Sequence, residues 1–326
     1  MIFLDRNRLM FRFPEVHEDA ICSIELQRTL RIPDDDKDYP LPPGLGAFEL
    51  RHLDDYSARL PQSWCRRGGV IAPMHQAEAM WINFTSDYPF AVKVATGKIC
   101  AITGDAWTNH LNCDPQDYAV LPDQPWLDGY SVEKGIIRQF VAMPLGGGYT
   151  VEEQLTEAAV HGGIQFVVYP IKAERYFDHG MQFLRSSFGR DTIMGLAPGG
   201  RMKQDIYDDR RGLDVWDQRH GSRCFVSLVN TAQWMAITGE RPPTDPPTAQ
   251  AYTARGLPWF DYYDGDSKVM AGSKKLRNLK SVAKNAEATS QSDLPDNETI
   301  LVPNVIALGK PGRRPVRESA GDESVF

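Results

Sequence analysis

The sequence predicts a β-dominated α+β protein with antiparallel hairpins, a central strand-helix-strand unit and few short helices. Three observations lead to this fold class. Residues 22–32 alternate between apolar and polar side chains, residues 79–102 hold short alternating runs separated by turn sequences, and residues 135–170 place a capped helix between two apolar runs. Alternation with a period of two is typical of strands, whereas a helix repeats its apolar residues every three or four positions.

The first strand is expected over residues 22–32. Its even positions are apolar, with Arg28 as the exception, which predicts a half-buried strand with one face in water. The segment that follows, residues 33–46, is rich in Pro, Asp and Gly and is expected to be a loop. The polar, odd-numbered positions of the strand are Ser23, Glu25, Gln27, Thr29 and Arg31.

Antiparallel hairpins are expected between residues 79 and 102. Apolar side chains alternate at residues 80–84 and again at 90–94, and an Asp-Tyr-Pro sequence separates the two runs. Gly97 marks a second turn before the apolar run at 99–102. Alternating runs joined by turn residues favour neighbouring antiparallel strands.

The central unit begins with a β-prone apolar run that ends at three consecutive glycines, residues 146–148. Thr150 is the expected N-cap of a helix, and Glu153 stands at the spacing of a capping box, in which the two side chains bond each other's backbone amides. Two glycines at 162–163 are expected to end this helix in the left-handed conformation, and an apolar strand follows them.

The later elements are weaker. A second glycine loop is expected at residues 195–201, followed by a strand over residues 202–207, and a further strand is expected at 224–229. Thr231 is the expected N-cap of a short helix that ends at Gly239.

A composite β-rich body is expected over residues 1–263, with a subdivision near residue 130 as one option. Aromatic residues become rare after Tyr263, so residues 264–326 are expected to be a basic segment and a largely disordered tail. The stretch from Lys274 to Lys284 predicts a weak, loosely attached basic amphipathic helix. Such a helix could make weak peripheral contact with an anionic membrane surface.

Composition excludes several classes of function. A net charge of −7 argues against a nucleic-acid binder, because neutralising phosphates needs clustered Lys and Arg. Five scattered cysteines form no CxxC pair, which favours reduced thiols in a cytoplasmic protein. The longest uncharged run, residues 224–239, is shorter than the roughly 20 apolar residues of a membrane span. We therefore expect a soluble protein with no transmembrane segment.

The densest polar segment lies between Asp205 and His220. Carboxylates with a histidine can hold a metal or supply a general acid and base. Neither a calcium-loop pattern nor HExxH is present, so no metal is predicted, and a loop in which Arg residues neutralise Asp residues is favoured. The catalytic candidates, should the segment be a site, are Asp208, Asp209, Asp217 and His220, together with His179.

Two further features bear on ligands. Gly146, Gly147 and Gly148 precede a helix, where backbone amides can bind an anion, but no phosphate-loop motif follows and a tight turn is the favoured interpretation. No cofactor is expected. Tryptophans near loops, such as Trp107 and Trp216, could form a platform for a carbohydrate or a peptide, although plugging the ends of a β-rich core is favoured for them.

Several segments together carry a resemblance: RQFVAMPLGGGYTVEEQLT, GLAPGGRMKQDIYDD, WDQRHGSRCFV and NTAQWMAITGERPP. The chain resembles, up to about residue 265, a group of uncharacterised bacterial and fungal proteins, some of which are labelled integral membrane proteins. This resemblance implies no activity, cofactor or catalytic residue.

Two functions from different classes follow from these features. The favoured hypothesis is a soluble, non-catalytic binding or assembly protein that uses aromatic-rich loops and sheet edges to bind a protein, small molecule or carbohydrate. The alternative is a hydrolase or metal-assisted enzyme centred on the segment between Asp205 and His220. The two differ in whether the Asp and His side chains converge in one concave site.

Overall fold

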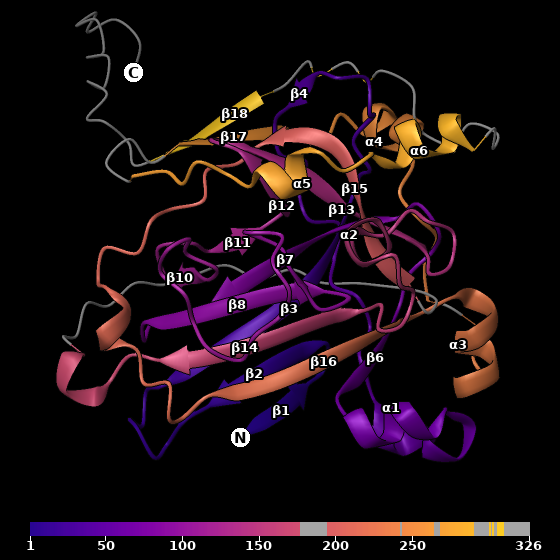
Figure 1. Cartoon of the computed structure of the whole chain (residues 1–326). Helices are drawn as coiled ribbons and strands as arrows, with labels where there is room; N and C mark the ends of the chain where they lie inside the picture. The colour runs from indigo at the N-terminus through magenta and orange to yellow at the C-terminus, as the bar shows by residue number, and fades with distance from the viewer. Residues whose placement is uncertain are drawn as a thin grey trace, which may run out of the picture.

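The structure is a computed structural model that describes residues 1–176, 194–241, 243–263, 268–289, 300, 302 and 305–309. The expected fold class is confirmed, because strands dominate and the helices between them are short (Figure 1). The α-helices are α1 (Gln62–Arg67), α2 (Val151–Thr156), α3 (Thr231–Thr238), α4 (Ala249–Ala254), α5 (Lys274–Arg277) and α6 (Val282–Ala288). The 3-10 helices are η1 (Leu53–Arg59), which is kinked at Tyr56, η2 (Ala173–Arg175) and η3 (Leu213–Val215).

One large mixed sheet organises the chain, in the order β1-β2-β3-β7-β13-β15-β16-β14-β8-β10. Its main strands are β1 (Ile2–Asp5), β2 (Arg8–Arg12), β3 (Ile21–Thr29), β7 (Ala79–Thr85), β8 (Phe90–Thr96), β10 (Ala119–Leu121), β13 (Ile136–Pro144), β14 (Ile164–Pro170), β15 (Met194–Lys203) and β16 (Ser222–Val229). Shorter strands on its margins are β4 (Asp38–Tyr39), β5 (Arg51–His52), β6 (Val70–Pro73), β9 (Ile99–Cys100), β11 (Trp126–Leu127) and β12 (Gly129–Glu133). A separate parallel pair joins β17 (Trp259–Tyr263) to β18 (Val305–Gly309).

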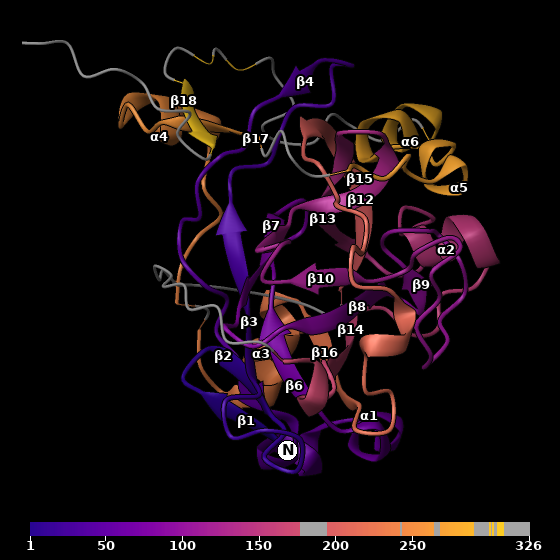
Figure 2. The ribbon, with the colours of Figure 1, turned by 90° about the vertical axis from the view of Figure 1, so that its left-hand side faces the viewer.

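The sheet folds over so that its first strands face its last ones across the core. Figure 2 shows β2 and β3 on one side of the body and β8, β10 and β14 on the other. The rings of Phe13 and Phe90 meet between these layers, 5.6 Å apart. Phe11, Ile24 and Phe166 are fully buried in the same cluster. Burial of this apolar surface is what holds the two layers together.

The polar face of β3 is buried, which corrects the expectation of a face in water. Gln27 and Thr29 are each 1% exposed. A loop crosses over them, because the Thr29 hydroxyl donates to the Pro43 carbonyl (3.0 Å) and the Phe48 amide donates to the Leu26 carbonyl (2.7 Å). The alternation therefore marked two different buried environments, one apolar and one hydrogen-bonded.

The hairpin expectation is confirmed in one place and wrong in another. Strands β8 and β9 form a hairpin whose turn places Gly97 and Lys98 at positive φ. Strands β7 and β8 do not pair with each other; β7 joins β3, β11 and β13, and β8 joins β14, β9 and β10. Period-two alternation specifies which side chains share a face, and it leaves the choice of neighbour open.

The central strand-helix-strand unit is confirmed as β13, α2 and β14, but its helix is shorter than expected. The capping box of Thr150 and Glu153 is present, and the helix ends at Glu157, which adopts φ +57°. The Glu152 carboxylate accepts the next free amides, including those of His161 (2.8 Å) and Gly162 (2.8 Å), so His161 lies beyond the helix. The Glu152 side chain thus accepts from backbone amides that would donate to backbone carbonyls if the helix continued.

Two later expectations also change. The segment expected as a second glycine loop is part of β15, where glycine allows close packing: a Cβ on Gly199 would lie 2.5 Å from Val141 Cγ2. Helix α3 is confirmed and ends at Gly239, but its N-cap is Asn230, whose side chain accepts from the Gln233 amide (2.8 Å).

The basic segment around residues 274–284, which was expected to be loosely attached, packs against the β-rich body. Leu276 and Val282 are 0% and 1% exposed, and the Ser273 hydroxyl donates to the Thr103 carbonyl (2.6 Å). Two short helices, α5 and α6, replace the single expected one. The apolar residues between the lysines therefore contribute to the core. The division at residue 263 stays a prediction, and the tail from residue 310 lies outside the described residues.

None of the helices in the described ranges combines the length and apolarity that crossing a bilayer requires.

All five cysteines are free thiols, of which Cys22, Cys100 and Cys224 are buried. Burial raises the pKa of each of these three thiols, which makes them poor nucleophiles.

Candidate functional site

The polar segment between Asp205 and His220 does not gather its carboxylates at one point. Asp208 pairs with Lys268 (2.7 Å), whereas Asp217 contacts His220, whose Nδ1 lies 2.7 Å from its Oδ2. Arg211 pairs with Asp123 (3.1 Å), which is outside the segment. Charge compensation therefore reaches beyond the loop at Asp208 and Arg211, and internal pairing by the other arginines stays a prediction.

Asp209 is a structural anchor for two aromatic side chains. Its Oδ2 accepts from the Tyr118 hydroxyl (2.6 Å) and from Trp216 Nε1 (2.8 Å), and its Oδ1 accepts from the Arg211 amide (2.7 Å). Burial, followed by the hydrogen bond to this carboxylate, raises the pKa of Tyr118. Both carboxylate oxygens are occupied, so Asp209 has little capacity left for a ligand.

Asp217 and His220 are the two catalytic candidates that the structure brings together. Burial alone would raise the pKa of Asp217, but hydrogen bonds from the His220 ring and from the Arg219 backbone outweigh it and lower that pKa. Within the described ranges, no group of three or more His, Cys, Asp or Glu side chains could hold a metal ion. His179 lies outside the described residues.

Backbone amides of the glycine loop, residues 146–148, are hydrogen-bonded to the carboxylate of Glu153. The amides of Gly146 and Gly148 donate to Glu153 Oε1 at 2.8 and 2.9 Å. The Thr150 amide (3.1 Å) and hydroxyl (2.6 Å) donate to Oε2 of the same residue. The amides that could have bound an external anion therefore bind Glu153. The capping-box spacing predicted the contact with Thr150, but not the one with the glycines.

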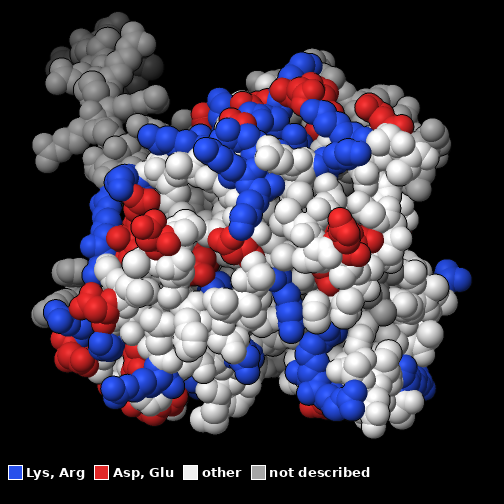
Figure 3. All heavy atoms as spheres, in the orientation of Figure 1, with Lys and Arg blue, Asp and Glu red and all other residues white. Residues whose placement is uncertain are grey.

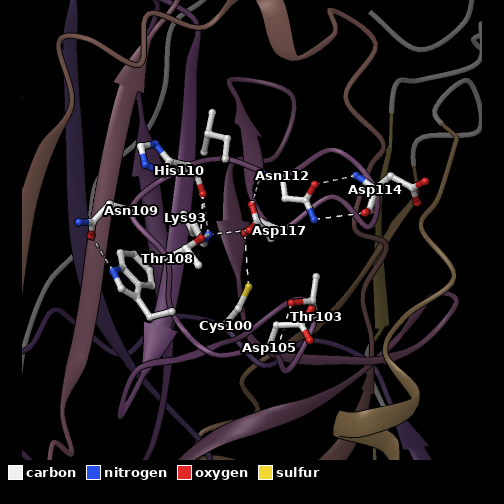
Figure 4. A network of polar contacts seen from close by, with 12 residues as sticks. Lys93, Cys100, Thr103, Asp105, Thr108, Asn109, His110, Asn112, Asp114 and Asp117 are labelled. Atoms are coloured by element: carbon white, nitrogen blue, oxygen red, sulfur yellow. Dashed lines mark hydrogen bonds and ion pairs between the residues drawn. The ribbon is translucent and has the colours of Figure 1, made fainter.

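A buried lysine, Lys93, lies at the centre of the network in Figure 4, and the sequence analysis missed it. It is 1% exposed, and its ammonium donates to Thr108 Oγ1 (2.9 Å), the His110 carbonyl (2.8 Å) and Asp117 Oδ2 (2.5 Å). The Trp107 ring lies 5.4 Å from the same nitrogen. The available signal was a single lysine inside the otherwise apolar run of β8.

This network is saturated by internal contacts. A lysine ammonium has three N–H donors, and each has an acceptor here. Asp117 Oδ1 also accepts from the Asn112 amide (2.9 Å), while burial raises the pKa of Asp117 against the opposing effect of Lys93. We conclude that the Lys93–Asp117 pair fastens the loop after β9 to the sheet, since neither charge is left for a substrate.

A second buried carboxylate, Asp128, lies near a small pocket. Its Oδ2 accepts from Gln204 Nε2 (2.5 Å), and its amide donates back to Gln204 Oε1 (2.9 Å). Burial raises the pKa of Asp128 to about 8, although contacts with Trp126 and Gln204 oppose it. The pocket beside them, lined by Leu41, Trp126, Asp205 and neighbours, has a volume of about 10 Å³, which fits one water molecule.

Most tryptophans considered as a ligand platform are inside the body. Trp216, Trp234 and Trp259 are 2%, 0% and 1% exposed. Trp107 and Trp126 are half-buried, and Trp107 Nε1 donates to Asn109 Oδ1 (3.0 Å). Stacking on a sugar needs an open ring face, so aromatic loops offer little of the surface that a carbohydrate site would use.

The basic side chains of α5 and α6 are largely neutralised. Lys284 pairs with Asp36 (2.6 Å), Arg277 lies 3.5 Å from Glu133, and Lys275 pairs with Asp105. Figure 3 shows Lys and Arg side chains mixed with acidic ones along the top of this face. A surface of mixed sign attracts an anionic membrane less than a purely basic one.

The free edge of β1 differs from all these features, because no strand among the described residues pairs with the outward side of it. The Met1 and Arg12 backbones exchange two hydrogen bonds of 2.8 Å, and Phe3 pairs with Met10 in the same register. In an antiparallel pair the residues between such pairs point their N–H and C=O groups away from the partner strand. Ile2 and Leu4 are those residues, and no described strand pairs with them on that side.

The side chains beside this edge are apolar and exposed. Phe3 is 48% and Met1 66% exposed, while Ile2 and Leu4 pack partly on the core. The Arg12 guanidinium lies 6.0 Å from the Phe3 ring centre. Figures 1 and 2 both place β1 at the lower margin of the molecule. An exposed edge with apolar side chains is a template for another strand.

No family model matches the sequence, and neither a curated protein nor a solved structure is significantly similar to it. The resemblance to uncharacterised bacterial and fungal proteins stays a prediction. Function therefore has to be inferred from the geometry alone.

Proposed function

We propose that this protein is a soluble, cytoplasmic, non-catalytic binding or assembly protein, and that it binds through the free edge of β1. The observation that carries the proposal is the outward-pointing backbone of Ile2 and Leu4 beside the exposed Phe3 ring. The partner class that fits such an edge is an extended segment of polypeptide, which adds one strand to the sheet.

The other candidate binding groups support this choice, because their hydrogen-bonding atoms already have partners within the chain. The glycine-loop amides bind Glu153, the Lys93 ammonium has three internal acceptors, and Asp209 binds two aromatic side chains. A small-molecule pocket usually has a volume of about 300–1,000 Å³. The pocket beside Gln204 is far smaller than this, so it does not itself fit a carbohydrate or another small ligand.

The geometry of β1 also predicts how a partner would be recognised. Main-chain hydrogen bonds to Ile2 and Leu4 would give affinity that does not depend on the partner's sequence. Phe3 lies on the exposed face of the same strand, so it would select a partner with an apolar side chain directly opposite. Asp5 next to it would disfavour an acidic residue at the neighbouring position.

The test uses an array of nine-residue synthetic peptides and two variants. Leu4→Pro removes the outward N–H without removing a hydrogen bond to β2, and Leu4→Ala keeps that N–H while truncating the side chain. Apolar, β-prone peptides should bind the wild-type protein and Leu4→Ala, and should lose binding to Leu4→Pro. Equal binding by Leu4→Pro, or no binding by the wild type, would contradict the proposal.

A hydrolase or metal-assisted enzyme remains the second candidate, because Asp217 holds the ring of His220 at 2.7 Å. A carboxylate that orients a histidine is one part of many hydrolytic sites. Metal analysis of the purified protein tests this candidate, with His220→Ala as the matched variant. Stoichiometric metal that is lost in His220→Ala, with the fold retained, would support the enzyme over the binding protein.

A further inference from the structure

We propose that the partner of β1 is the β1 strand of a second copy of this chain, in an antiparallel pair whose two-fold axis passes through Phe3. This inference rests on the proposed function and names the occupant of the edge. The β1 residues are Ile-Phe-Leu-Asp, with outward-pointing backbone groups at Ile2 and Leu4. Phe3 lies midway between them.

The hydrogen bonds of this edge are complementary to themselves. Outward-pointing groups of one strand must face outward-pointing groups of the other for a ladder to form. A two-fold axis through Phe3 places Ile2 opposite the second copy's Leu4, and the reverse. Each of these two pairs exchanges two hydrogen bonds, so all the outward groups of Ile2 and Leu4 are satisfied. A shift by one residue would leave no pair in register.

The side chains on the exposed face are complementary as well. Phe3 comes opposite the second copy's Phe3 as a non-hydrogen-bonded pair, the position where cross-strand side chains approach most closely. The apolar ring that is 48% exposed in one chain would then be covered by its equivalent. Aromatic side chains that face each other across two strands stabilise the pair.

The charges around the edge favour the same register. Asp5 falls opposite the second copy's Met1, and Arg12 lies next to Met1 on β2. The carboxylate of one chain is therefore separated from the guanidinium of the other by one strand, with the second copy's Met1 between them. In the part of the chain that the structure describes, no ion pair involves Asp5 or Arg12, and the Arg12 guanidinium lies 6.0 Å from the Phe3 ring centre. Two such arrangements arise from one two-fold axis.

A four-residue edge buries a small area, so the dimer should be weak. Interfaces below about 1,200 Å² belong to transient complexes. Sedimentation velocity of the full chain over about 1 to 500 µM should therefore show a concentration-dependent shift from the 36.6 kDa monomer towards twice that mass. A chain that stays monomeric over this range would overturn the inference.

Charge variants at Phe3 test the register directly. Phe3→Glu and Phe3→Lys each place like charges on the two-fold axis and should weaken association about tenfold or more. An equimolar mixture of the two should associate again, because Glu then faces Lys. Met235→Glu, at another exposed apolar residue, is the matched control and should dimerise like the wild type. No rescue in the mixture would overturn the proposed pairing.

The peptide array separates the failure of this inference from the failure of the proposed function. A monomeric chain whose array binding is lost in Leu4→Pro would overturn self-pairing and leave the binding function intact, with another protein as partner. A monomeric chain that also binds no peptide would overturn both. A dimer that persists in Phe3→Glu and Phe3→Lys would show that the copies meet at a different surface.

Discussion

Replacement of Lys93 by methionine should destabilise the fold by about 3–5 kcal/mol, the usual cost of removing one member of a buried ion pair. Methionine keeps most of the volume of the lysine stem, so the loss should arise from polar contacts and not from a cavity. Lys93 is 1% exposed and its ammonium has three acceptors. Without it, the Asp117 carboxylate would keep only the Asn112 backbone amide as a donor among the described contacts.

The assay is equilibrium unfolding in urea at pH 7, followed by tryptophan fluorescence. Lys98→Met is the matched control, because Lys98 belongs to the same hairpin but is exposed, and a surface substitution usually changes stability by less than about 0.5 kcal/mol. The double variant Lys93→Met/Asp117→Asn removes both charges at once. Its cost should be at least about 2 kcal/mol smaller than the sum of the single costs, since neither charge is then left buried alone.

Two results would refute this reasoning. If Lys93→Met unfolds within 1 kcal/mol of the wild type, taken as about the scatter of such measurements, the ammonium does not hold the loop to the sheet. If the two substitutions are additive, Lys93 and Asp117 do not act as a pair. Either result would reopen Lys93 as a residue with capacity for a ligand.

Three further predictions concern other parts of the fold. Thr150→Ala should lower the free energy of unfolding by about 1 kcal/mol through loss of the N-cap, measured in urea, and Thr150→Ser should not. Gly162→Val should cost more, because Gly162 adopts φ +57°, and an unchanged urea midpoint would contradict that conformation. Burial raises the pKa of Asp128 from 3.8 to about 8, so the folded protein keeps a proton that the unfolded chain loses. Stability should therefore fall as pH rises from about 4 to 8, and midpoints at several pH values should show a smaller fall in Asp128→Asn.

Local features of the fold were predictable, because they depend on residues close in sequence. The capping box of Thr150 and Glu153, the Gly97 turn and the Gly239 cap each follow from backbone requirements within a few residues. The neighbours of each strand were not predictable in this way. Strands β13 and β14 flank one helix, yet they lie in different parts of the sheet.

The polar residues of β3 show why burial was harder to predict than alternation. Gln27 and Thr29 are polar and alternate with apolar residues, which normally indicates a face in water. A loop that passes Pro43 covers them and accepts a hydrogen bond from the Thr29 hydroxyl, whereas the Gln27 side chain donates to Glu25 on the same strand. The cost of burying a polar group disappears when a partner is present, and a sequence pattern holds no information about that partner.

The candidate site was difficult for the same reason. The sequence points to the glycine loop and to Asp209, and the structure satisfies both internally, the glycine amides with Glu153 and Asp209 with Tyr118. Lys93, which no sequence pattern marks, is paired with Asp117 in the same way. A group that is already satisfied has little free energy to gain from a ligand. The edge of β1 is the opposite case, because within the described residues no strand pairs with the outward N–H and C=O groups of Ile2 and Leu4, and an added strand would supply partners for them. The binding edge that we propose therefore follows from outward backbone groups of the described residues, and not from catalytic residue types.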